Sequence, residues 1–145
     1  MKTIIVYYTH SGNTKALATR KAKELDCDIE EIIEVKKANM IVALYRVVTR
    51  GKTMIEPLKS NLDEYEKIII MSPVWASLPV SAVNSVIDCL PVGKKVELIM
   101  VSGGGGTKKT AAGTKELVTG RGCEVVGYTD LKAKKVNNEV VSEDI

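Results

Sequence analysis

Residues 9–14 bring together groups that bind phosphate in proteins. They read Thr-His-Ser-Gly-Asn-Thr and lie between an apolar run and a helical pattern. The first turn of a helix leaves backbone NH groups without acceptors and carries the positive end of the helix dipole, so it attracts anions. We expect Gly12 to let the backbone approach the anion closely. The alternative is an ordinary helix start, capped by Ser11, Asn13 or Thr14.

A second loop carries the only tryptophan of the chain. Residues 72–79 read Ser-Pro-Val-Trp-Ala-Ser-Leu-Pro, and the two prolines restrict the loop that holds Trp75. An indole at the end of a strand can stack on a flat heteroaromatic ring. The alternative is a Trp75 side chain folded back onto the core.

A third loop is rich in glycine. Residues 102–107 read Ser-Gly-Gly-Gly-Gly-Thr, a composition that suits neither a strand nor a helix. Glycines here would let backbone NH groups reach the edge of a ligand. The alternative is a merely flexible loop.

The elements that hold these loops alternate between strands and helices. Four apolar runs rich in β-branched residues predict strands at residues 4–8, 67–71, 96–101 and 123–128, and an acidic run at 28–35 predicts an edge strand. Helical spacing predicts four helices between them. Their marker residues are Leu17, Ala18, Ala22 and Leu25 in the first, Met40, Ile41, Leu44, Tyr45 and Val48 in the second, Val80, Val83, Ile87 and Leu90 in the third, and residues 107–118 in the fourth.

This alternation predicts a doubly wound α/β protein with a parallel sheet and helices on both faces. We expect one domain over residues 1–145. Ligands of such sheets bind beyond the carboxyl ends of the strands, where the three loops converge. Together the loops describe a site for a flat ring that carries a phosphorylated side chain.

This chain lacks the residues that other phosphate-binding families on similar sheets require. No cysteine stands five residues before an arginine in the first loop, as tyrosine phosphatases of this size require. No acidic pair ends the first strand, as in receiver domains, and no Gly-Lys-Ser/Thr follows it, as in Walker-type ATPases.

The three loops together resemble those of the flavodoxin family. Thr-His-Ser-Gly-Asn-Thr is similar to that family's phosphate loop, and Ser-Pro-Val-Trp-Ala-Ser-Leu-Pro and Val-Ser-Gly-Gly-Gly-Gly are similar to its second and third loops. The resemblance covers about residues 1–130. It implies a flavodoxin-like five-stranded sheet in the order 2-1-3-4-5, in a three-layer α/β/α arrangement.

The ligand that this resemblance implies is FMN. The implied cofactor-binding residues are Thr9, His10, Ser11, Gly12, Asn13 and Thr14 in the first loop, Pro73, Val74, Trp75, Ala76 and Ser77 along the ring, and Ser102, Gly103, Gly104, Gly105 and Gly106 at its pyrimidine end. His10 occupies the variable position of the first loop, which faces the ring in that family. The second loop contains no glycine, so a positive φ there would cost about 1 kcal/mol or more. We therefore expect weaker stabilisation of the one-electron-reduced flavin than in a dedicated carrier.

The implied function is low-potential electron transfer to a redox partner protein or a small-molecule acceptor, with no catalytic side chain. The net charge of +3 differs from the acidic surface of dedicated flavodoxins. Together with Lys108 and Lys109, it keeps open a small FMN-dependent NAD(P)H:quinone-type oxidoreductase. A flavodoxin-like binding module without cofactor is the third alternative.

Composition and charge limit the partners and the location. Basic and acidic residues are mixed along the chain, so we expect no nucleic-acid partner. No apolar run has the length of a membrane span, and Cys27, Cys89 and Cys123 form neither a disulfide framework nor a zinc pattern. We expect a cytoplasmic protein with no metal and no membrane contact.

The C-terminal residues predict a last helix that is short or missing. Asn137 or Asn138 could cap it, but only about two turns fit before Ile145. Without a full helix, apolar sheet surface would meet water. Three options follow: the tail covers this surface, a second subunit covers it in a homodimer, or the polypeptide is truncated.

Overall fold

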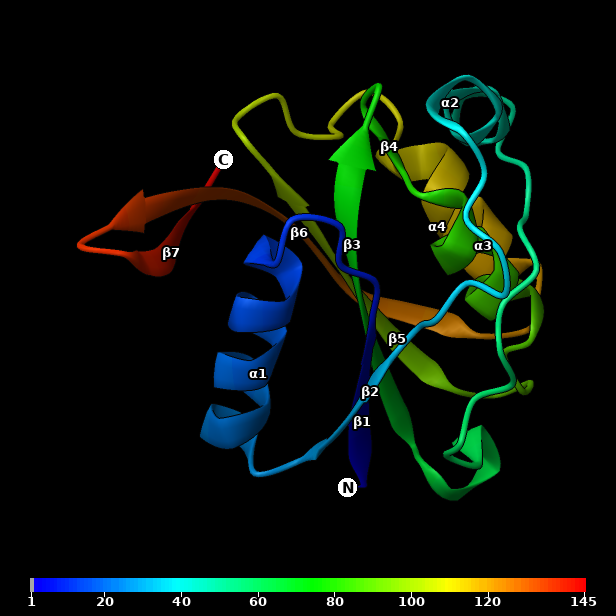
Figure 1. Cartoon of the computed structure of the whole chain (residues 1–145). Helices are drawn as coiled ribbons and strands as arrows, with labels where there is room; N and C mark the ends of the chain where they lie inside the picture. Colours follow the sequence, from blue (N-terminus) through cyan, green and yellow to red (C-terminus); the bar gives the residue numbers. More distant parts are fainter. Residues whose placement is uncertain (1) are drawn as a thin grey trace.

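The computed structural model describes residues 2–145 and shows alternating strands and helices (Figure 1). The helices are α1 (Asn13–Leu25), α2 (Met40–Val48), α3 (Ser81–Asp88) and α4 (Ala111–Thr119), with a short 3-10 turn at Leu62–Glu64. The strands are β1 (Thr3–Tyr7), β2 (Asp28–Glu31), β3 (Lys67–Trp75), β4 (Leu78–Pro79), β5 (Lys95–Ser102), β6 (Glu124–Val136) and β7 (Glu139–Asp144).

The sheet follows the order β2-β1-β3-β5-β6-β7. Strands β2, β1, β3, β5 and β6 run parallel, which confirms the predicted 2-1-3-4-5 sheet. Two short additions were not predicted: β4 pairs antiparallel with the end of β3, and β7 pairs antiparallel with β6. The strand predicted at 28–35 is shorter than expected, and it lies at the edge as its acidic residues indicated.

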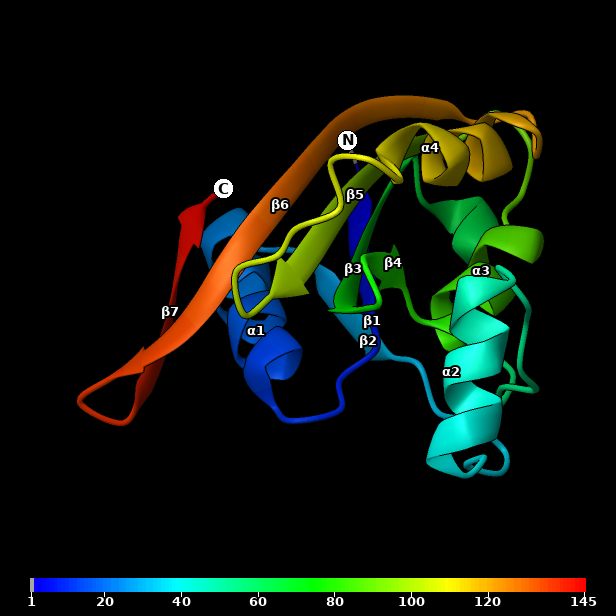
Figure 2. The same cartoon turned by 90° about the horizontal axis from the view of Figure 1, so that it is seen from above.

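The core lies on both faces of the sheet, and it is mainly aliphatic because the chain has no phenylalanine. One cluster packs between the sheet and the side that carries α2, α3 and α4, and the other packs beneath α1. Seen from above, the two sides are separated by the sheet (Figure 2). The central strands are therefore buried on both faces, as in other parallel sheets.

The predicted start of a last helix is wrong. Asn137 and Asn138 have φ values of 51° and 64° and form the two-residue turn of the hairpin between β6 and β7. Two consecutive positive φ values give the turn type whose twist matches a hairpin, and asparagine tolerates this conformation better than most residues. The acidic residues after the turn therefore belong to a strand.

This hairpin covers the sheet beside α1, where a last helix was expected. Val140 packs against the cluster beneath α1, and its carbonyl accepts a hydrogen bond from Nη2 of Arg20 at 2.7 Å. In Figures 1 and 2 the hairpin lies next to α1. The tail itself thus covers this face, which is the first of the three options.

The second helix forms where predicted, but its apolar face does not pack into the core. Val47 is its only buried residue. Asn39 caps the helix by accepting from the NH of Val42 at 2.9 Å. The other apolar side chains of α2 are largely exposed, so the predicted helical spacing is confirmed, but the face that these residues share meets solvent.

Candidate functional site

The first loop connects β1 to α1 and is shaped by Gly12. This glycine lies at the N-cap of α1 with a φ of 97°, and no side chain caps the helix. The hydroxyl of Thr9 accepts from the NH of Gly12 at 3.1 Å and from the NH of Lys15 at 3.4 Å. The alternative, capping by Ser11, Asn13 or Thr14, does not occur. Because Thr9 accepts from Lys15, the NH groups of Asn13 and Thr14 are the ones in the first turn that remain for an external acceptor.

The space above this loop is open. A Cβ added at Gly12 would have no heavy atom within 4 Å. A side chain would therefore fit, and glycine is favoured here because of its positive φ. His10 and Ser11 are exposed, Thr9 and Asn13 are half-buried, and Thr14 is buried. An anion could thus approach the NH groups from solvent.

The second loop is a tight hairpin between β3 and β4. Ala76 and Ser77 form its turn with φ values of 50° and 64°. The sequence contains no glycine here, yet the structure adopts positive φ twice, at a cost of about 1 kcal/mol or more for each residue. The hydroxyl of Thr110 donates to the carbonyl of Ser77 at 2.5 Å and helps to hold the turn. The loop thus adopts the costly conformation without a glycine, and the weaker stabilisation of the one-electron-reduced flavin stays a prediction.

The base of this loop is fixed from within. The hydroxyl of Ser72, which is fully buried, accepts from the NH of Val80 at 3.2 Å and donates to the carbonyl of Pro73 at 2.8 Å. Pro73 and Val74 are half-buried, whereas Ala76 and Ser77 are exposed. The loop thus presents its tip to solvent on a rigid base.

Trp75 lies partly on the core and partly in solvent. The indole packs partly against the core cluster and remains half-exposed. The imidazole of His10 meets it edge to face, with ring centroids 5.2 Å apart and an interplanar angle of 88°. Two residues predicted from separate loops therefore lie in direct contact.

The third loop is partly closed on itself. The hydroxyl of Ser102 accepts from the NH groups of Gly104 and Gly106 at 3.2 and 3.3 Å. Gly103 and Gly105 are exposed, with open space where a Cβ would lie. Only part of the predicted row of glycine NH groups is therefore free of an internal acceptor.

Asp130 on β6 anchors the end of this loop and was not predicted from the sequence. Its carboxylate accepts from the NH of Thr107 at 3.0 Å and from the hydroxyl of Thr107 at 2.7 Å. Tyr128 adds a short hydrogen bond to the same hydroxyl. A carboxylate just beyond the predicted end of the fifth strand was the signal that could have revealed this anchor.

Two tyrosines where β1 ends, just before the first loop, form hydrogen bonds with glutamate side chains. The hydroxyl of Tyr7 donates to Glu31 at 3.0 Å, and that of Tyr8 donates to Glu34 at 2.5 Å. Burial, followed by the hydrogen bond and the charge of Glu31, raises the pKa of Tyr7 to about 12. Burial and Glu34 raise the pKa of Tyr8 in the same way. Both phenols therefore remain protonated donors at neutral pH.

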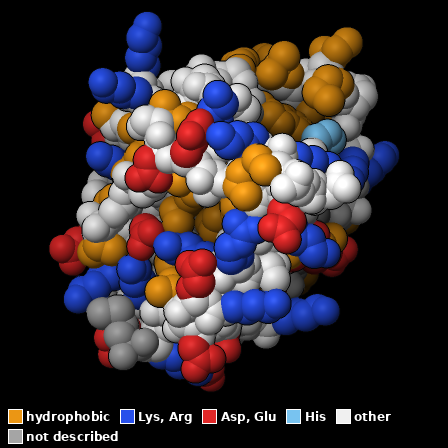
Figure 3. Space-filling view, turned by 90° about the vertical axis from the view of Figure 1, so that its left-hand side faces the viewer, with side chains coloured by type: hydrophobic (Ala, Val, Ile, Leu, Met, Phe, Trp, Pro, Cys, Tyr) orange, Lys and Arg blue, Asp and Glu red, His pale blue; other side chains and the backbone are white. Residues whose placement is uncertain are grey.

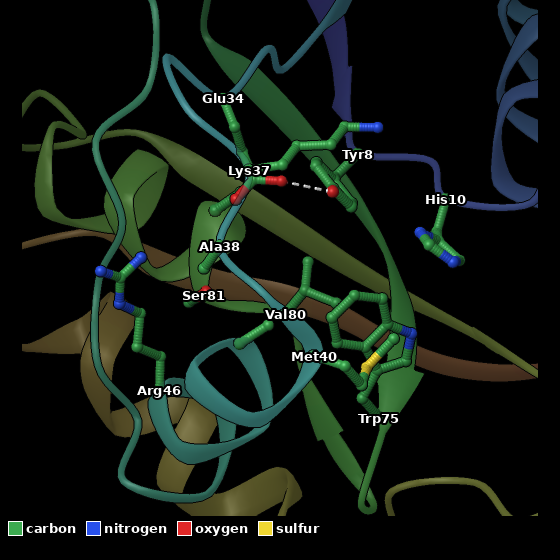
Figure 4. A pocket seen from close by; sticks show the side chains of 12 residues that line it. Tyr8, His10, Glu34, Lys37, Ala38, Met40, Arg46, Trp75, Val80 and Ser81 are labelled. Atoms are coloured by element: carbon green, nitrogen blue, oxygen red, sulfur yellow. Dashed lines mark hydrogen bonds between the residues drawn. The ribbon is translucent and has the colours of Figure 1, made fainter.

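A small cavity of about 70 Å³ lies between α2, the start of α3 and Trp75 (Figure 4). Of the predicted site residues, only His10 and Trp75 line it. Tyr8, Glu34, Lys37 and Met40 also line it and were not predicted as site residues. The cavity is bordered on one side by the Tyr8–Glu34 hydrogen bond, which Figure 4 shows as a dashed line.

Among residues 2–145, no group of three or more His, Cys, Asp or Glu side chains is placed to hold a metal ion. No helix in the same range is long and apolar enough to cross a membrane.

Comparisons with known proteins place this geometry in context. No family model and no curated protein matches the chain. Among solved structures, it is similar to a flavoprotein from Lactobacillus acidophilus in complex with FMN, at 25% identity and a TM-score of 0.74, over 89% of this chain and 92% of that one.

Two further structures share the fold at lower identity. A WrbA-like flavodoxin from Agrobacterium tumefaciens is 17% identical with a TM-score of 0.59, over 86% of this chain and 76% of that one. Oxidised flavodoxin 1 from Bacillus cereus is 19% identical with a TM-score of 0.54, over 95% and 89% of the two chains. The chain is thus flavodoxin-like, as its three loops indicated.

Proposed function

We propose that this flavodoxin-like chain binds FMN at the carboxyl edge of its sheet and transfers electrons through it. The observation that carries the proposal is the first loop: α1 begins at Gly12, which has a positive φ and no side-chain cap, and a Cβ built at Gly12 would meet no atom within 4 Å. Such a helix start binds phosphate groups. The similar flavoprotein from Lactobacillus acidophilus was crystallised with FMN.

The residues present fit the parts of FMN. Residues 9–14 would hold the phosphate, residues 73–77 would lie along the ring, and residues 102–106 would meet its pyrimidine end. The half-exposed indole of Trp75 supplies the aromatic surface. Gly103 and Gly105 are exposed residues, and their NH groups would be donors for the ring edge.

Bound FMN supplies the redox chemistry, and the chain binds and orients it. The neighbouring loops would exclude water from part of the ring, and Trp75 and His10 would set the polarity beside it. No side chain has to act as an acid or a base in this role. Low-potential electron transfer to a partner protein or a small acceptor is therefore the function that we favour.

A small FMN-dependent NAD(P)H:quinone-type oxidoreductase is the second candidate. Lys108 and Lys109 are exposed after the third loop and could attract an anionic cofactor or substrate. No aromatic residue occurs in residues 102–110, so the ring would lack a cover from that loop. A binding module without cofactor is less well supported, since the first loop retains its donors.

The location and organisation of the protein remain predictions. Cys27, Cys89 and Cys123 are free thiols, in keeping with the predicted cytoplasmic location. Residues 1–145 are proposed to form one domain.

The absorbance spectrum of the purified protein tests the proposal. We expect the two bands of an oxidised flavin between about 350 and 500 nm, either as purified or after addition of FMN. A colourless protein that takes up no FMN would contradict the proposal. Stopped-flow mixing with NADH or NADPH then separates the candidates, because only a reductase loses the flavin bands without a further protein.

A further inference from the structure

The second helix presents an apolar surface to solvent, which we call the α2 surface. Its exposed fractions are 83% for Ile41, 67% for Tyr45 and 62% for Met40. Its remaining members are Leu44 and Val48. A contiguous apolar surface of this kind is unusual in a monomer and marks a site of interaction.

The α2 surface is continuous with the candidate cofactor site. Met40, at the first turn of α2, lines the same cavity as His10 and Trp75 (Figure 4). Figure 3 shows hydrophobic side chains grouped beside the one histidine of the chain. A protein that covers α2 would therefore also reach the edge of the second loop.

The charges around this surface are positive. Lys36 and Lys37 precede the helix and are exposed, and Lys37 lines the cavity next to Met40. Arg46, on the helix itself, is half-buried and donates to the hydroxyl of Thr53 at 3.0 Å.

The carboxylate of Glu34 lies near these cations, but it is not exposed enough to neutralise their charge at the surface. Glu34 is half-buried and accepts the hydroxyl of Tyr8. The exposed cations next to the first turn of α2 are thus Lys36 and Lys37.

From this combination we infer that the α2 surface is the docking surface for an acidic electron-transfer protein. An apolar centre with a positive rim is complementary to an apolar patch surrounded by carboxylates. The inference rests on the proposed function, since it makes α2 the place where the redox partner of the FMN site binds. In that complex one electron leaves the reduced centre of the partner and enters the flavin, or passes in the opposite direction.

A second copy of this chain fits the surface less well. Symmetric pairing through α2 would bring the lysine-rich rims of two net-positive chains together, and like charges across an interface oppose association. An acidic partner gains from the same charges. The positive rim therefore decides between the two occupants.

The test uses an oxidised, acidic [2Fe–2S] ferredoxin as the probe and titrates it by calorimetry into the FMN-loaded full chain. We expect binding that weakens as ionic strength rises. The double variant Ile41→Gln, Tyr45→Gln should weaken it about tenfold or more, because exposed aromatic and aliphatic anchors dominate such interfaces. Leu25→Gln is the matched control, since Leu25 is an exposed apolar residue at the end of α1.

Charge is tested with a second matched pair. Lys37→Glu should weaken binding and reduce its salt dependence, whereas Lys95→Glu, at the start of β5, should leave both unchanged. Basic cytochrome c serves as the probe of opposite charge and should bind more weakly than the ferredoxin. With reduced ferredoxin, the rate of flavin reduction should fall in the same variants.

The outcomes separate this inference from the proposed function. If the wild-type chain takes up no FMN, the absorbance spectrum shows this before any titration, and the proposed function is refuted. A chain that holds FMN but binds no ferredoxin refutes the docking inference alone, as do α2 variants that bind it as tightly as the wild type. A dimer in light scattering that the α2 variants convert to a monomer would assign the surface to a second copy, and would also overturn the inference.

Discussion

His10 and Trp75 lie edge to face, with ring centroids 5.2 Å apart, and this contact joins the loop after β1 to the hairpin after β3. The two residues are 65 positions apart in the sequence, and parallel pairing of β1 with β3 brings their loops together. Aromatic pairs of this geometry contribute about 0.5–1.5 kcal/mol beyond simple burial. The contact therefore positions the indole before any ligand arrives.

Replacing His10 should loosen the indole and weaken FMN binding. We expect His10→Ala to raise the dissociation constant of FMN by about two- to tenfold, which corresponds to the energy of one aromatic pair. Since Trp75 is the only tryptophan, its fluorescence reports on this site alone. FMN should quench it in the wild type. Unchanged affinity and unchanged emission in His10→Ala would show that the contact has no role in binding.

Gly12 offers a test of the phosphate loop with a matched control. Gly12 and Gly93 both have positive φ, at 97° and 86°, and a Cβ at either position meets no atom within 4 Å. Gly12→Ala and Gly93→Ala should each lower the free energy of unfolding by about 1 kcal/mol. Only Gly12→Ala should also weaken FMN binding, by about tenfold or more, as measured by fluorescence titration.

Equal FMN affinity in the two glycine variants would contradict the placement of the phosphate. The control is informative because Gly93 lies at the opposite edge of the sheet, before β5, where its NH donates to the carbonyl of Gly122. A general loss of stability would affect both variants alike.

The parallel sheet and the three loops could be predicted because each strand and each loop has its own local pattern of residues. The contact of His10 with Trp75 could not, since it depends on how far each loop bends over the sheet. The exposed face of α2 was missed for a related reason: periodicity shows that apolar residues share a face, but it does not show what that face meets. Asp130 was missed because the fifth strand extends beyond the predicted end at residue 128, to Val136.

The turn between β6 and β7 was read as a helix start because asparagine favours both conformations. A helix cap and a hairpin turn make opposite predictions for Asn138, which has a φ of 64°. In the hairpin, Asn138→Gly should stabilise the protein by a few tenths of a kcal/mol and Asn138→Ala should destabilise it by about 1 kcal/mol. Thermal unfolding measures both. At a helix cap glycine would be slightly destabilising, so a destabilising glycine would favour the helix, whereas alanine destabilises the protein in either conformation.

Tyr7 and Tyr8 should make the protein less stable at high pH. The folded state raises the pKa of Tyr7 from 10.0 to about 12, and that of Tyr8 rises as well. Their stabilising effect is complete below pH 10, where both states are protonated. It is lost as the pH rises from 10 through 12, because the unfolded chain ionises first.

The double variant Tyr7→Phe, Tyr8→Phe isolates this effect. It should unfold more easily at neutral pH, because two hydrogen bonds to Glu31 and Glu34 are lost. Its free energy of unfolding should fall less steeply than that of the wild type between pH 10 and 12, in urea titrations at each pH. Parallel curves for the two proteins would mean that these phenols do not cause the alkaline loss.

Asp130 should determine how well the third loop is ordered for the cofactor. Asp130→Ala removes Oδ1, which accepts from both the NH and the hydroxyl of Thr107, and leaves the buried NH without a partner, which costs about 1–3 kcal/mol of stability. FMN must then order the loop as it binds, so we expect its dissociation constant to rise about tenfold. Asp130→Asn keeps a carbonyl acceptor and should restore most of the affinity. Asp88→Ala is the control, because the exposed pair of Asp88 with Lys52 contributes at most about 1 kcal/mol and lies away from the loop. If Asp130→Ala loses stability but binds FMN as tightly as Asp88→Ala, the carboxylate supports the fold without preparing the site.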